Sequence, residues 1–114
     1  MSNELAGEFS SKYFHTFKTG TFSVIGFDAR YLTDERHKDE CLQNLVKLVD
    51  LHDCQILAVD LENVGLVSSW ILGVLAAVHK HGIEVCLYHP SPEIQGVLQV
   101  THLDELLSVR GEVT

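Results

Sequence analysis

Two adjacent serines, Ser68 and Ser69, are the residues whose type and position offer the clearest route to chemistry. They stand directly before a stretch with the apolar spacing of a helix, so one of them is expected to be its N-cap. A serine hydroxyl can also be a nucleophile, but hydrolases hold it in a G-x-S-x-G turn beside a His/Asp set. The chain shows neither feature around Ser68, so an enzyme is not expected and no catalytic residue is assigned.

Asp60 and Trp70 bracket the loop that leads to the serines. Asp60 ends an apolar run and is expected to hydrogen-bond the following loop and hold it in place. Trp70 has two interpretations that both stay open. It is an anchor for a protein partner, because tryptophan is enriched among such anchors, or it is a core residue that covers the end of the sheet.

The histidines do not indicate a metal site. His79 and His81 are two residues apart, so on a helix they point to different faces. His15 and His89 show no convergence in the sequence. No Gly-rich phosphate-binding motif is present either. We therefore expect neither a metal nor another cofactor.

Apolar spacing predicts the elements that carry the loop. Aromatic and β-branched runs over 13–17 and 21–27, joined by a Thr-Gly turn, predict a β-hairpin. The later patterns predict a helix over 34–52, a strand over 56–61, a helix over 70–81 that stops at Gly82, a strand over 83–88, a helix from Pro92 capped by Ser91, and a short last helical segment from Thr101 or His102.

This alternation predicts an α/β domain with a mixed sheet of four to five strands, an N-terminal hairpin and helices packed on it. Function in open α/β sheets lies outside the carboxyl ends of the strands, which indicates the loop between Leu61 and Trp70. The 114 residues suit a single domain over 1–114, with residues 1–8 as a loose tail.

Net charge limits the classes of partner, and the N-terminus and the cysteines indicate the cellular compartment. Eight Lys+Arg against sixteen Asp+Glu give a net charge of −8, which disfavours nucleic acid and anionic membranes as partners. The N-terminus lacks a secretion signal, and the longest charge-free stretch, 63–79, is too short to span a membrane. Cys41, Cys54 and Cys86 have no CxxC spacing, so reduced thiols in a cytoplasmic protein are expected.

Four features in order resemble the STAS family, the fold of bacterial anti-sigma-factor antagonists. They are an apolar strand that ends in Asp60-Leu61, Ser68-Ser69 before a helix with Leu72-Gly73, a strand before Pro90-Ser91-Pro92, and Val100-Thr101-His102-Leu103-Asp104 before a closing apolar pair. The likeness covers about Leu57–Leu107 in motif and Tyr13–Val109 in topology. It implies a STAS-like fold and a binding switch rather than a catalyst.

In that family, a partner anti-sigma kinase phosphorylates the first serine of an Asp-Ser-Ser-Gly motif, and the phosphorylated form releases the partner. The resemblance implies that Ser68 is the phosphoacceptor, and that the loop 62–66 flanks a partner surface of Val67, Ser68, Ser69 and Trp70. The chain departs from the motif with Val67 in place of Asp and Trp70 in place of Gly. These departures leave open the alternative that the serines are helix caps only.

A second function fits the same residues. The domain would be a structural subunit that self-associates or docks within a larger signalling or sensor assembly, with Ser68 unmodified. The missing acidic residue and the bulk of Trp70 favour this interpretation. A monomer that binds a kinase one-to-one would indicate the antagonist, and concentration-dependent homo-oligomers would indicate the subunit.

Overall fold

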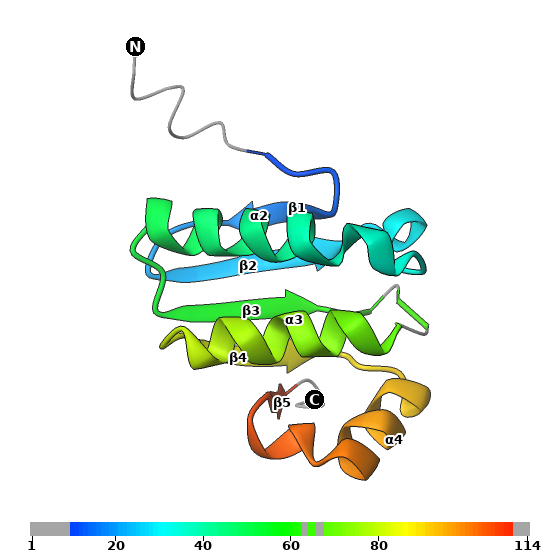
Figure 1. Ribbon diagram of the computed structural model, residues 1–114. Coiled ribbons are helices and arrows are strands. Elements are labelled where there is room, and N and C mark those ends of the chain that lie inside the picture. Colours follow the sequence, from blue (N-terminus) through cyan, green and yellow to red (C-terminus); the bar gives the residue numbers. More distant parts are fainter. Residues whose placement is uncertain (1–9, 63, 66–67, 111–114) are drawn as a thin grey trace.

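The computed structural model describes residues 10–62, 64–65 and 68–110 (Figure 1). Its strands are β1 (Phe14–Lys18), β2 (Phe22–Phe27), β3 (Ile56–Asp60), β4 (Glu84–Tyr88) and β5 (Ser108–Arg110). Its α-helices are α2 (Lys38–Leu51), α3 (Ser69–Lys80) and α4 (Pro92–Thr101), and short 3₁₀ helices are η1 (Ala29–Tyr31), η2 (Glu35–His37) and η3 (Leu103–Glu105). The predicted tail and Val67 lie outside the described residues.

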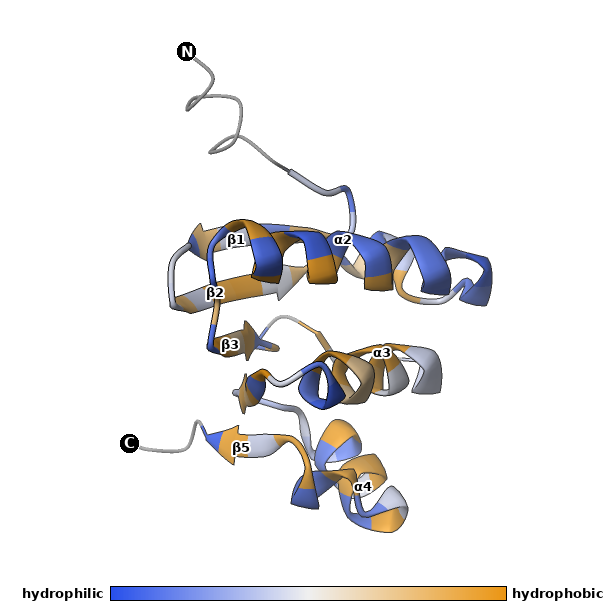
Figure 2. Ribbon diagram, turned by 60° about the vertical axis from the view of Figure 1, so that its left-hand side comes forward, coloured by the Kyte–Doolittle hydropathy of each residue, from blue (hydrophilic) through white to orange (hydrophobic). Residues whose placement is uncertain are grey.

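The strands form one mixed sheet in the order β1-β2-β3-β4-β5. β1 pairs antiparallel with β2, as the predicted hairpin requires, and β2 to β5 are parallel neighbours. Each parallel connection moves one strand along in the same direction, so crossovers of one hand place their helices on one face of the sheet. Figure 2 shows α2, α3 and α4 on the same side of the strands. β5 has three residues, and the sequence pattern does not predict it.

The core lies between this face of the sheet and the helices. Alternate strand residues point toward the helices and are fully buried, namely Ile25, Leu57, Val59, Val85 and Leu87. They belong to one cluster with Ile71, Leu75 and Val78 of α3, which are the apolar stripe predicted for that helix. Within the described part of the chain, no helix has the length and apolar character needed to cross a membrane.

The helix predicted over 34–52 begins later in the structure. Asp34 accepts a hydrogen bond from the backbone N–H of Arg36 at 2.9 Å, which starts η2 as a tight 3₁₀ turn. α2 then begins at Lys38, with Asp39 and Glu40 in its first turn near the positive end of the helix dipole.

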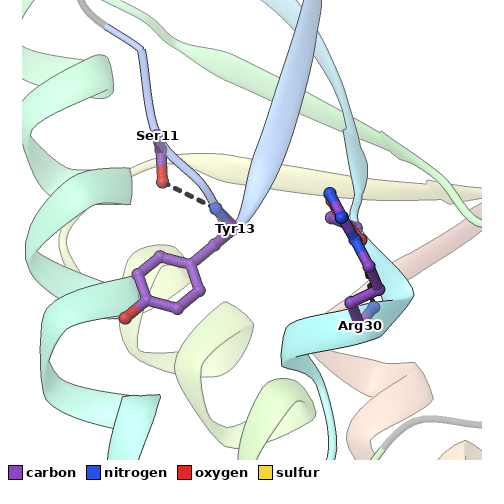
Figure 3. Close-up of polar contacts among 4 residues, drawn as sticks. Ser11, Tyr13 and Arg30 are labelled. Atoms are coloured by element: carbon purple, nitrogen blue, oxygen red, sulfur yellow. Dashed lines mark hydrogen bonds and ion pairs between the residues drawn. The ribbon is translucent and has the colours of Figure 1, made fainter.

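Tyr13 ties the start of the hairpin to α2 (Figure 3). Its ring is buried, and its backbone N–H donates to the Ser11 hydroxyl oxygen at 3.1 Å. Its own hydroxyl donates to Glu40 Oε1 at 2.7 Å. Desolvation and the adjacent Glu40 raise the pKa of Tyr13 above its ordinary value, so this hydroxyl remains a hydrogen-bond donor.

Candidate functional site

The loops after β3 and β4 meet at the carboxyl edge of the sheet. Ser91 joins them, because its hydroxyl donates to the Gly65 carbonyl oxygen at 2.7 Å. The same hydroxyl oxygen accepts the backbone N–H of Ile94 at 3.2 Å, so Ser91 is the N-cap of α4 with Pro92 at its start, as predicted. One side chain therefore fixes α4 and supports the loop that leads to Ser68.

Ser68 is the N-cap of α3, with extended backbone angles of φ −70° and ψ 151°. Its carbonyl oxygen accepts the N–H of Ile71 at 3.0 Å, but its hydroxyl makes no cap hydrogen bond. Ser68 is half-buried and Ser69 is exposed, so the turn lies at the surface of the described part of the molecule. α3 ends as predicted, with Gly82 at φ +102° directly after its C-cap.

The first turn of α3 differs in charge from those of the other two described α-helices. α2 carries Asp39 and Glu40 there, and α4 carries Glu93, whereas α3 has no acidic residue. The free N–H groups of a helix start attract anions. The first turn of α3 therefore has the electrostatic preference for an anion without an acidic side chain of its own to satisfy it.

Trp70 points into the molecule. It is 7 % exposed and belongs to the main apolar cluster, which favours the core interpretation over an exposed partner anchor. Its indole Nε1 is buried and has no hydrogen-bond partner among the described residues. The ring thus supports the start of α3 from below.

Asp60 holds the loop as expected from its position. Its Oδ1 accepts the backbone N–H of Glu62 at 3.0 Å. The same oxygen lies 3.4 Å from Nδ1 of His89, the first residue after β4. One carboxylate oxygen each of Asp60 and Glu62 and one ring nitrogen of His89 all lie within 4.8 Å of one another.

The sequence showed no convergence of His89 with other such groups, and the structure brings it beside Asp60 and Glu62. The cluster forms because β3 and β4 are adjacent and parallel, so residues that follow both strands meet at one edge. Predicting the cluster therefore requires the order of the strands in the sheet, which apolar spacing along the chain does not determine.

The remaining candidate groups are the hydroxyl of Ser68 and three thiols. Among the described residues, the hydrogen bonds of histidine side chains go to Tyr13, Ile83 and Asp60, and none goes to the Ser68 hydroxyl. Cys41, Cys54 and Cys86 are buried. Burial raises the pKa of the Cys41 thiol to about 12 and also raises the pKa of Cys86, the opposite of what a reactive thiolate requires.

Comparison with known proteins rests on structure. No family model matches the chain, and no curated protein matches it in sequence. Among solved structures, the NMR structure of the protein TM1081 superposes with a TM-score of 0.71 at 16 % identity, over 90 % of this chain and 82 % of that one. The anti-sigma factor antagonist SpoIIAA in its unphosphorylated form superposes with a TM-score of 0.68 at 15 % identity, over 87 % of this chain and 89 % of that one.

These similarities extend over most of each chain, so they concern the whole domain rather than one motif. The chain therefore has the STAS-like α/β fold, the fold of the anti-sigma factor antagonist SpoIIAA.

Proposed function

We propose that this domain is a non-enzymatic, cytoplasmic protein-interaction module of the anti-sigma-factor-antagonist type. Its partner is an anti-sigma factor with serine kinase activity or another signalling protein. The binding surface is the turn at the start of α3, with Ser68 and Ser69 at its centre, Val67 before them and the loop 62–66 beside them. Trp70 contributes from beneath this surface, where it fixes the turn.

Phosphorylation of Ser68 releases the partner. A phosphate adds about −1.5 to −2 charge at pH 7, and the N–H groups at the start of α3 accommodate it locally. A partner packed on the turn would then face a bulky dianion. A penalty of a few kcal/mol changes affinity by orders of magnitude, because each ~1.4 kcal/mol is a factor of ten.

The observation that carries the proposal is that the hydroxyl of Ser68 makes no cap hydrogen bond among the described residues. The hydroxyl of Ser91, the N-cap of α4, donates one hydrogen bond and accepts another. The hydroxyl of Ser68 makes no cap hydrogen bond. A hydroxyl with no cap hydrogen bond among the described residues is available for modification, and the first turn of α3 lacks a competing carboxylate. SpoIIAA, an antagonist described in an unphosphorylated form, supplies the analogy.

The test is a quantitative pull-down from the native cell with Ser68→Ala and Ser68→Asp, each compared with the unaltered protein. Ser68→Ala is expected to retain the partner. Ser68→Asp is expected to recover at least about tenfold less of the partner than the unaltered protein does. Gln99→Glu is the matched control, since it adds one negative charge at an exposed residue of α4 that lies outside this surface, and it is expected to retain the partner. Equal recovery of the same partner with both Ser68 variants would refute the switch.

A further inference from the structure

We propose that the helix-free face of the sheet is a second binding surface, which takes a single segment of a protein partner. The segment carries apolar side chains followed by a basic one. This surface is separate from the hydroxyl of Ser68 and does not depend on phosphorylation. The two proposals can therefore fail independently.

The first reason is topology. Sheets built from parallel strands are normally covered on both faces. In this molecule β2 to β5 are parallel, and the described helices all lie on one face (Figure 2). None of the described elements covers the opposite face.

The second reason is the composition of that face. Pairing places Phe22 beside Ile56, and Val24 beside Ala58 and Cys86, in rows that run across the strands. These residues alternate with the buried ones of the core, so they point away from the helices. A sheet face that remains in water normally carries polar side chains, and these rows are apolar.

The third reason is the shape of the face. A groove of about 310 Å³ is lined by Phe22, Val24, Ala58, Asp60, Tyr88 and His89. Ala58 at the floor of the groove is only 1 % exposed between larger neighbours on β2 and β4, so an apolar side chain from outside packs over it and against the partly buried Phe22 and Val24. Phe17 of β1 adds an exposed ring, 65 % accessible, that reaches over Gly26 on the same face.

The fourth reason is charge, which differs between the two ends of the face. At one end Glu84 is paired with Arg110 at 3.7 Å. At the other end, the ion-pair partner of Asp60 is His89, and none of the ion pairs among the described residues involves Glu62. The groove thus ends at two carboxylates with no Lys or Arg paired to them, and a basic side chain of the occupant complements them.

The size of the face favours one segment over a second copy of the domain. Five strands about 4.8 Å apart, with about five residues each at roughly 3.3 Å per residue, cover roughly 300 Å². A stable pair of globular chains buries about 800 Å² on each partner. An extended peptide needs far less area, and its alternate side chains point to one side, toward the groove.

The probe is the tripeptide acetyl-Leu-Leu-Lys-amide, titrated into the full chain labelled with ¹⁵N at low salt. We expect saturable shifts of the amides of Val24, Ala58 and Tyr88. Acetyl-Leu-Leu-Glu-amide and acetyl-Ser-Ser-Lys-amide test the charge and the apolar requirement separately, and both are expected to bind more weakly. Shifts that are absent, or equal for all three peptides, would overturn the proposal.

Variants locate the site. Ala58→Ile fills the groove with an apolar side chain that suits a strand and is expected to abolish the shifts, with thermal melting as the check on folding. Glu62→Gln is expected to weaken binding about threefold, the size of an exposed ion pair. Asp50→Asn is the matched control, because Asp50 lies 3.5 Å from His81 in a similar Asp–His pair outside the groove residues.

Two further results in the free protein would contradict this occupant. Concentration-dependent shifts of the same amides would show that a second copy covers the face. Contacts between the Ala58 methyl group and residues 1–9 in nuclear Overhauser spectra would show that the chain covers it with its own N-terminus. If the peptide fails while the Ser68 variants behave as expected, only this second surface is refuted.

Discussion

Ser68 and Ser91 occupy the same position at the starts of two helices, yet the fold uses them differently. Ser91 joins the N–H of Ile94 to the carbonyl of Gly65, whereas the hydroxyl of Ser68 makes no cap hydrogen bond. Among the described residues, the side chain of Ser91 therefore contributes to the capping of its helix, and that of Ser68 does not.

The pair gives a direct prediction for stability. Ser91→Ala is expected to lower the free energy of unfolding by about 1–2 kcal/mol, the usual cost of a lost N-cap. Ser68→Ala is expected to cost less than about 0.5 kcal/mol, the usual range for a surface substitution. Urea denaturation of both variants checks this. Equal losses would mean that Ser68 caps α3 with its side chain after all.

Trp70 is a residue-scale test of the turn's support. Its Nε1 has no partner among the described residues, so Trp70→Phe removes a costly buried donor while it keeps most of the ring. We expect Trp70→Phe to lower the free energy of unfolding by less than about 1.5 kcal/mol, and Trp70→Ala by about 3–5 kcal/mol. Thermal and urea unfolding measure both. A loss of partner binding in a Trp70→Phe variant of unchanged stability would instead favour the anchor interpretation.

At the scale of elements, two aspartates start the 3₁₀ helices that precede α2. Asp28 and Asp34 each accept from an arginine two residues on, and these hydrogen bonds lower the pKa of both carboxyls from 3.8 to about 2. A lowered folded-state pKa contributes stability above the unfolded value, and that contribution is lost as the pH falls from about 3.8 through about 2.

Carboxyl ¹³C shifts followed against pH measure these values. Midpoints near 2 for Asp28 and Asp34 are expected, with the Asp34 midpoint moving up toward 3.8 in Arg36→Gln. Midpoints near 3.8 in the unaltered protein would show that the arginine pairs are not formed in solution.

The elements also show which parts of the structure the sequence predicts. The Ser-Pro pair at 91–92 and Gly82 are local signals, and both the N-cap of α4 and the end of α3 were predicted correctly. The start of α2 was placed too early, because the periodicity does not distinguish a 3₁₀ turn capped by Asp34 from an α-helical turn. The three residues of β5 are too few for a strand pattern.

Some features of the candidate site could also be predicted from the sequence, and others could not. The Ser68 turn and the role of Asp60 follow from positions along the chain. The approach of His89 to Asp60 requires β3 and β4 to be adjacent, which is a tertiary fact. Trp70 stands one residue into a helix, where the sequence alone does not decide between the core and the surface.

At the scale of the whole molecule, the Ser68 turn and the apolar groove belong to opposite sides of one sheet. The helices cover one face, and the start of α3 brings Ser68 to the carboxyl edge. The opposite face carries an apolar groove that ends at Asp60 on the same edge.

Phosphate occupancy of Ser68 in partner-bound and free protein tests the central claim most directly. The native domain is isolated from cells before and after starvation, separated by size into complexed and free fractions, and measured by intact mass and peptide mass spectrometry. The account predicts unmodified Ser68 in the complex and a phosphate on Ser68 in the free fraction. Ser68 without phosphate in both fractions, under every condition, would contradict it.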